Sequence, residues 1–187
     1  MEELSHQLLR TYPLRQPELD LFLSYWKSTN YEKGRHLLRE GQVSNYLYFV
    51  GSGSVRIYYL KEDKEITEWL TLDNSFFFSI RSFFNRTPSN LSIHLLEPSC
   101  IYQLHHDDLM QLCDQYHEIE KLFRRMVTTS LVLSQIRMES IQFETAQQRY
   151  HRLLEQSPDI LKRVPLSYIA SFLGITQETL SRVRNSR

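Results

Sequence analysis

The sequence predicts an α+β fold: a small β-barrel or sandwich with flanking helices, followed by a long helix and a compact helical segment. Three observations support this prediction. Short β-rich runs alternate with turns between Tyr31 and about Leu104, apolar residues recur at three- and four-residue steps through 117–143, and two short amphipathic segments surround Gly174. A length of 187 residues is enough for one large domain or two small ones.

Residues 2–30 are expected to be helical, in two pieces. Apolar side chains recur there at helical spacing: Leu4, Leu8, Leu9, Leu19, Phe22, Leu23 and Trp26. Pro13 and Pro17 lie between the two groups, and proline interrupts a helix because it lacks the backbone N–H and clashes with the preceding turn. The sequence therefore predicts a helical pair in front of the β-rich region.

Six β-rich runs follow, and turn residues separate them. The runs read HLLRE, YLYFVGSG, SVRIYYL, EITEWL, LSIHLL and CIYQL. Breaks fall at Glu40-Gly41, Gly51-Ser52-Gly53, Glu62-Asp63 and Glu97-Pro98. Several short strands at this spacing are typical of a small barrel or sandwich.

Two helices are expected after the strands, a short one over 106–115 and a long one over about 117–143. The long segment carries a seam with heptad spacing: Ile119, Leu122, Met126, Thr129, Leu133, Ile136, Ser140 and Phe143. Further apolar positions widen its face: Phe123, Val127, Leu131 and Val132. The seam favours a homodimer, the wider face favours packing against the helix's own domain, and one helix can do both.

The segment Pro165–Arg184, PLSYIASFLGITQETLSRVR, is the most informative in the chain. Ala170 lets a second helix approach closely, Gly174 can take the positive φ of a sharp turn, and Thr176 is a good N-cap. The outer face is polar: Gln177, Glu178, Ser181, Arg182 and Arg184. This pattern predicts a helix-turn-helix whose second helix enters the DNA major groove. The alternative is an ordinary helical hairpin packed in a core.

Charge is distributed unevenly, although the formal net charge of the chain is zero. From Thr145 onward seven Lys and Arg against three Asp and Glu give +4, and over 1–144 a count of 15 against 19 gives −4. A basic end on an acidic body fits phosphate contacts that are made from that end only.

Several classes of protein are not expected. No apolar run is long enough to span a membrane, and the first residues do not form a secretory signal. Cys100 and Cys113 are too few for a disulfide framework or a zinc site, so a cytoplasmic protein with reduced thiols is expected. The seven histidines are dispersed, so no metal or cofactor is predicted. An enzyme is not expected either, because there is no convincing nucleophile–base pair and no phosphate-binding glycine loop.

Two segments carry a resemblance to a known family. Arg39–Tyr59 (REGQVSNYLYFVGSGSVRIYY) resembles the opening barrel strands, and Gly174–Arg184 (GITQETLSRVR) the recognition-helix signature, of the bacterial cAMP receptor protein and its FNR-type relatives. The resemblance covers nearly the whole chain. It implies a β-roll (a jelly-roll-like barrel) as sensor over 1–116, a dimerisation helix over 117–143, and a helix-turn-helix DNA-binding domain over 144–187. The implied protein is a homodimeric transcription regulator.

The resemblance also implies which residues contact DNA. They are Thr176, Gln177, Glu178, Thr179, Arg182 and Arg184. Side-chain chemistry agrees, because Arg182 suits guanine, Gln177 suits adenine and Glu178 can accept from cytosine. The threonines correspond to phosphate-side positions, and Arg184 is expected to reach phosphate. The implied partners are double-stranded DNA, a second copy of the chain, RNA polymerase and a small-molecule effector of unknown identity.

The cyclic-nucleotide site departs from the family pattern. Members that bind cAMP place a Glu on the ribose and an Arg on the cyclic phosphate, whereas Ser79 and Ser89 occupy the aligned positions here. A buried phosphate without a cation is strongly unfavourable, so a response to cAMP through the usual site is not expected. Arg81 or Arg86, the latter followed by Thr87, can substitute only if the loop shifts.

Aromatic residues crowd the same segment: Phe76, Phe77, Phe78, Phe83 and Phe84. Core filling is the favoured interpretation, and an apolar pocket for another effector is the alternative. Such a degenerate pocket is expected at Phe78, Ser79, Arg81, Arg86, Thr87 and Ser89. Three residues follow Arg184, so the β-hairpin wing of many family members is not expected. The rival hypothesis is a ligand- or partner-binding β-roll with a weak or vestigial DNA-binding domain.

Overall fold

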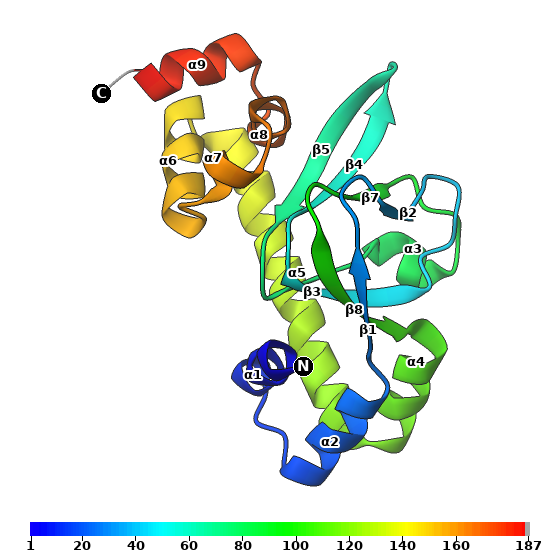
Figure 1. The fold of residues 1–187 in the computed structure, drawn as a ribbon. Helices are drawn as coiled ribbons and strands as arrows, with labels where there is room; N and C mark the ends of the chain where they lie inside the picture. The colour runs from blue at the N-terminus through cyan, green and yellow to red at the C-terminus, as the bar shows by residue number, and fades with distance from the viewer. Residues whose placement is uncertain (186–187) are drawn as a thin grey trace.

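The computed structural model describes residues 1–185 and consists of a β-roll, a long helix beside it and a group of C-terminal helices (Figure 1). Two antiparallel four-stranded sheets form the roll, in the orders β1-β8-β3-β6 and β2-β7-β4-β5. The strands are β1 Lys27–Tyr31, β2 His36–Leu38, β3 Tyr46–Ser52, β4 Val55–Lys61, β5 Lys64–Thr71, β6 Ser75–Phe77, β7 Ser92–Leu95 and β8 Ser99–His105. The predicted α+β class is confirmed, and the barrel is an open roll.

Helices precede, interrupt and follow the roll. They are α1 Glu2–Thr11, α2 Gln16–Ser24, α3 Ile80–Asn85, α4 His106–Gln115, α5 His117–Phe143, α6 Ala146–Gln156, α7 Ile160–Arg163, α8 Leu166–Leu173 and α9 Gln177–Asn185. The predicted helices over 106–115 and 117–143 are confirmed as α4 and α5. Among the described residues, no helix combines the length and the apolar character needed to cross a membrane.

One prediction at the start of the chain is wrong. Residues 27–30 are not helical: α2 ends at Ser24, and Lys27–Tyr31 form β1, which pairs with β8. The segment KSTNY is polar and lies at a sheet edge, so it lacks the apolar alternation that marks a half-buried strand. Its conformation depends on pairing with a strand far along the chain. The short strand β6, which pairs with β3, had no sequence signal either.

Side chains from both sheets fill the interior of the roll. The buried members are Leu38, Tyr48, Val50, Val55, Ile57, Phe77, Ile93, Leu95 and Ile101. Strand β3 contributes Tyr48 and Val50 to this interior, while Leu47 and Phe49, which alternate with them, point to the opposite face. The strand is therefore buried on both faces.

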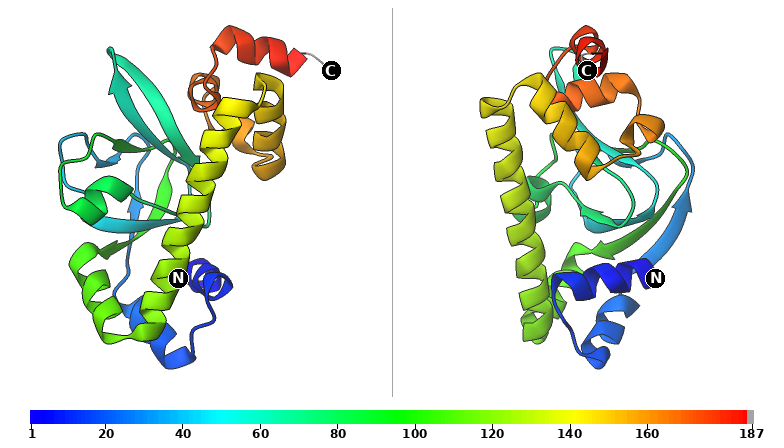
Figure 2. Two further views of the ribbon diagram at one scale, coloured as in Figure 1. Left: turned by 180° about the vertical axis from the view of Figure 1, so that it is seen from behind. Right: turned by 90° about the vertical axis from the view of Figure 1, so that its left-hand side faces the viewer.

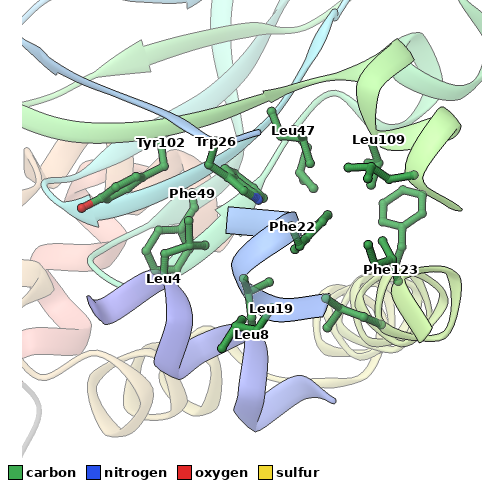
Figure 3. Packing of buried hydrophobic residues seen from close by; sticks show 14 of the residues in the cluster. Leu4, Leu8, Leu19, Phe22, Trp26, Leu47, Phe49, Tyr102, Leu109 and Phe123 are labelled. Atoms are coloured by element: carbon green, nitrogen blue, oxygen red, sulfur yellow. The ribbon is translucent and has the colours of Figure 1, made fainter. Parts of the chain in front are cut away.

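A second apolar cluster joins the outer face of the first sheet to α1, α2, α4 and the beginning of α5 (Figure 3). Its fully buried residues include Leu4 and Phe22 from the N-terminal helices, Phe49 from β3 and Leu109 from α4. The N-terminal helices are therefore part of the roll's structural unit.

The environment of α5 changes along its length. Ile119, Leu122 and Phe123 are buried in the second cluster. The C-terminal half leaves large apolar side chains exposed: Leu131, Val132, Leu133, Ile136, Met138, Ile141 and Phe143. Figure 2 shows this helix running along one edge of the molecule. The predicted packing of the helix against its own domain is thus confirmed for the first part of the seam, and the rest is uncovered in a single chain.

Candidate DNA-binding surface and effector region

A small core holds the C-terminal helices together. Its buried members are Leu96, Tyr150, Leu153, Ile160, Val164, Ile169, Ala170, Leu173 and Leu180. Leu180, which is 1 % exposed, is the buried residue of α9, and it packs in the same cluster as Ala170 and Leu173 of α8. This burial determines which face of α9 points away from the protein.

The turn between α8 and α9 has a defined hydrogen-bond geometry. Gly174 has a φ of 68°, and its amide donates to the Ser171 carbonyl at 3.1 Å. The amide of Ile175 donates to the Ala170 carbonyl at 3.0 Å. Together these bonds form a Schellman motif, in which glycine takes a left-handed conformation that a Cβ would disfavour. The predicted positive φ at Gly174 is confirmed, and the turn fixes the angle at which α9 leaves α8.

The outer face of α9 exposes most of the residues predicted to contact DNA. Exposed members are Thr176, Gln177, Glu178, Arg182 and Arg184. Thr176 caps the helix as predicted, because its hydroxyl accepts a hydrogen bond from the Thr179 amide at 3.2 Å. Thr179 is half-buried, and its hydroxyl accepts from Arg182 at 3.2 Å. A hydrogen bond with Thr176 lowers the pKa of Glu178, so the carboxylate is charged at neutral pH.

Two arginines outside the motif hold the C-terminal end of α8. Arg137 of α5 donates to the Phe172 carbonyl at 2.8 Å, and Arg149 of α6 donates to the Leu173 carbonyl at 2.9 Å. The last carbonyls of a helix lack helical partners and carry partial negative charge, so both contacts stabilise α8. Sequence reasoning missed these residues because each reaches the motif from a distant helix.

The two serines predicted to replace the Glu and Arg of cAMP-binding family members are buried side by side. Ser79 is 1 % exposed and Ser89 is 4 % exposed, and their hydroxyl oxygens are 2.9 Å apart in a hydrogen bond. The amide of Leu91 also donates to the Ser89 hydroxyl, at 2.9 Å. The two neutral hydroxyls therefore bond to each other, and neither side chain supplies a carboxylate or a guanidinium.

The other polar residues of the predicted pocket lie outside this buried space. Arg81, Arg86 and Thr87 are exposed. Arg86 donates to the Ser44 carbonyl at 2.9 Å and to Asn45 Oδ1 at 2.5 Å, so a neighbouring loop holds its guanidinium. The structure brings the two serines together and leaves both arginines away from them.

The aromatic residues of the same segment divide between the two apolar clusters. Phe77 is buried inside the roll, and Phe83 is buried in the second apolar cluster, outside the roll. Phe76 and Phe78 are partly buried against that second cluster. The prediction that these residues fill the barrel is therefore confirmed for Phe77 only, whereas Phe76, Phe78 and Phe83 pack in the cluster outside it and Phe84 is 40 % exposed.

We expect cAMP and cGMP at millimolar concentration to leave the melting temperature of the protein unchanged. The reason is that the Ser79–Ser89 pair offers neither the cation nor the carboxylate that the ligand needs. Thermal unfolding with and without each nucleotide measures the effect. A ligand present at about 100 times its dissociation constant stabilises by about 2.7 kcal/mol, so a rise of several degrees would contradict this expectation.

Histidine, cysteine and carboxylate side chains do not gather into a metal site within residues 1–185, where no group of three or more could hold an ion. His105 instead caps α4, because its Nδ1 accepts from the Asp107 amide at 3.2 Å. Cys100 and Cys113 are free thiols.

Comparison with known proteins supports the same architecture. Residues 28–116 match the family model of the cyclic nucleotide-binding domain. The cyclic AMP receptor protein of Thermus thermophilus is 24 % identical over 174 residues, which cover 91 % of this chain and 81 % of that protein. FixK2 of Bradyrhizobium japonicum is similar in structure, with a TM-score of 0.73 at 19 % identity over 85 % of this chain and 82 % of that chain. CLP of Xanthomonas campestris, a c-di-GMP responsive global regulator, has a TM-score of 0.69 at 19 % identity over 90 % and 89 % of the two chains.

Proposed function

Because this chain is a Crp/Fnr-like protein, we propose that it is a DNA-binding transcriptional regulator that acts as a homodimer. In this proposal residues 1–116 form the sensor, 117–143 the dimerisation helix and 144–187 the DNA-binding domain. The observation that carries the proposal is the exposed polar face of α9. Buried Leu180 and the turn at Gly174 hold that face away from the rest of the protein.

The side chains on α9 suit the major groove. Arg182 can donate two hydrogen bonds to guanine, Gln177 can pair with adenine, and the carboxylate of Glu178 can accept from cytosine N4. Thr176 lies at the N-terminal end of the helix, where hydroxyl and backbone N–H groups suit a phosphate. The helix would therefore carry both positioning and base-reading contacts.

Dimerisation is supported by the uncovered half of α5. Exposed Leu133, Ile136 and Phe143 all lie on the heptad seam. A parallel pair of these helices would remove that apolar surface from water and relate two copies of α9 by a two-fold axis. A two-fold arrangement reads a DNA site with two inverted halves.

The usual effector site of the family would be inactive in this regulator. Buried Ser79 and Ser89 hydrogen-bond to each other, and the nearby arginines lie outside. We infer that cAMP does not control the protein through this site. An effector bound at the predicted degenerate pocket would meet Phe78 and the two serine hydroxyls. Arg81, Arg86 and Thr87 would lie at the surface.

Selection of duplex DNA from a randomised pool tests the proposal. We expect the wild-type protein to enrich a two-part site, and the logarithm of its affinity to fall linearly with the logarithm of salt concentration because counterions are released from the phosphates. Failure to enrich any sequence, with binding no stronger than to random duplex, would favour the rival: a ligand- or partner-binding roll with a vestigial helix-turn-helix.

A further inference from the structure

Arg56 on β4 is a buried cation on the outside of the roll. Its neighbours Val55 and Ile57 point into the roll interior, so Arg56 faces outward. It is nevertheless 1 % exposed and is the largest of the fully buried side chains in the described part of the protein. An outward-facing arginine with this burial must be covered by another element.

Helix α8 provides that cover. The ring of Tyr168 lies over the guanidinium carbon of Arg56 at 3.7 Å, and the ring of Tyr58 on β4 lies at 4.5 Å. The guanidinium also donates to the Thr67 hydroxyl at 2.9 Å and to the Glu65 carboxylate, both on β5. Arg56 therefore has polar partners within its own sheet and an aromatic partner in the helix-turn-helix.

Two further contacts join α8 to the hairpin formed by β4 and β5, and both involve residues of β5 near Arg56. The amide of Thr67 donates to the Ser171 hydroxyl at 2.8 Å, and Trp69 meets Phe172 edge to face at a centroid distance of 6.3 Å. Figure 1 shows α8 between the β4–β5 hairpin and α6, with α9 above α6. Thr67 connects Arg56 to α8, because its hydroxyl accepts a hydrogen bond from Arg56 and its amide donates one to Ser171 of α8.

An ion pair extends this attachment beyond the hairpin. Arg163 of α7 donates to both carboxylate oxygens of Asp73, at 2.6 and 2.9 Å, and to Glu97 at 2.6 Å. The hydrogen bond from Arg163 holds the pKa of Asp73 below its ordinary value. This contact lies before α8, while the Arg56 contact lies on α8 itself.

Attachment of α8 has a consequence for α9. The Schellman turn at Gly174 fixes the angle between the two helices, so the orientation of α8 determines the orientation of the exposed face of α9. Because the ring of Tyr168 lies over Arg56, moving α8 off the hairpin separates a buried cation from one of its two aromatic partners. The docked orientation is therefore favoured over others.

We propose that Arg56 is a positioning residue for DNA recognition, which through Tyr168 fixes the orientation of α8 and α9 relative to the roll and α5. This inference rests on the proposed function. In a two-fold dimer that orientation sets the distance between the two copies of α9. Arg56 therefore determines which half-site spacing the protein accepts.

The first test measures the contact without DNA. Tyr168→Leu removes the ring that α8 contributes, Tyr58→Leu is the matched control that removes the ring on β4, and Tyr168→Phe keeps the ring. Hydrogen exchange of the Thr67 amide reports docking, because its acceptor is Ser171 on α8. We expect exchange to accelerate about tenfold in Tyr168→Leu and to stay within about threefold of wild type in the other two variants.

A double-mutant cycle assigns the effect to Arg56. Arg56→Met should accelerate the same exchange, and adding Tyr168→Leu to it should have little further effect if the two side chains act through each other. Additive effects of the two substitutions would overturn the assignment to Arg56. Circular dichroism establishes first that the Arg56→Met variant is folded, and the Tyr168 series tests the contact if it is not.

The second test uses DNA. Duplexes carry two inverted copies of the half-site that the wild-type protein selects from a random pool, with the spacer lengthened or shortened by one base pair. We expect wild type to prefer one spacer about tenfold, and Tyr168→Leu to lose most of this preference while its affinity for a single half-site stays within about threefold. A residue that only stabilises folding would weaken binding to every duplex alike.

The outcomes separate this inference from the proposed function. Unchanged Thr67 exchange in Tyr168→Leu, or an unchanged spacing preference, overturns the positioning of α9 by Arg56. If the wild-type protein selects no DNA at all, the proposed function fails and the DNA part of this inference fails with it. The exchange measurement still reports separately whether Arg56 holds α8 in place.

Discussion

Replacing Arg182 with alanine is expected to lower the affinity for the selected DNA site by about 5- to 150-fold per half-site. This range corresponds to a bidentate arginine–guanine contact worth about 1–3 kcal/mol. Arg182 is exposed on α9, so its loss should change the free energy of unfolding by no more than about 0.5 kcal/mol. Discrimination should be lost mainly at the base pair that Arg182 contacts, and other positions should keep theirs.

Titration of labelled duplex at several salt concentrations measures this effect. Arg10→Ala is the matched control, because Arg10 is an exposed arginine on α1 at the other end of the molecule (Figure 1). It removes the same charge and should leave the affinity within about twofold. Equal affinities of the wild type and Arg182→Ala for DNA across the salt series would contradict the proposal that α9 is the DNA-recognition helix.

Replacing Ile136 with glutamate is expected to dissociate the proposed homodimer. Ile136 is 40 % exposed in the single chain and lies on the heptad seam of α5. In a two-fold pair each substitution removes apolar surface that the dimer would bury and places an unpaired charge there, and both copies carry it, so the dimer should weaken by about 100-fold. Two carboxylates brought together at the interface add repulsion.

Sedimentation equilibrium gives the oligomeric state directly. Gln142→Glu introduces the same charge on the same half of α5 but off the seam, and should leave the dimer intact. DNA measurements should then show that Ile136→Glu binds a single half-site like the wild type but no longer prefers two. A wild-type protein that sediments as a monomer at micromolar concentration would contradict the proposal that α5 forms a dimer.

The helices were predictable because their signals are local. The seam that begins at Ile119, together with the turn residues around it, was enough to predict α4 and α5 with the bounds that the structure has. Gly174 and Thr176 likewise have the conformations expected of them, since a left-handed turn and an N-cap depend on a few adjacent residues. The polar outer face of α9 follows from the same periodicity.

Strands and contacts that depend on distant partners were not predictable in this way. Lys27–Tyr31 is a strand because β8 pairs with it, and nothing in KSTNY indicates this. In the sequence, Arg137 and Arg149 look like ordinary charged residues of helices. Only the tertiary structure shows that both contact the C-terminal end of α8. Arg56 has the sequence context of a polar residue on a half-buried strand, and its contact with Tyr168 depends on the docking of α8.

The chain's own pattern was thus sufficient for the fold class and the helix-turn-helix, while the interpretation of Ser79 and Ser89 came from the family resemblance. The fold class and the helix-turn-helix depend on residue type and short-range spacing, which a linear sequence contains. Tertiary structure alone decided that the two serines bond to each other, which half of α5 is left uncovered, and how α8 is attached to the roll. Those features depend on long-range packing, in which the partners of a side chain lie far from it in sequence.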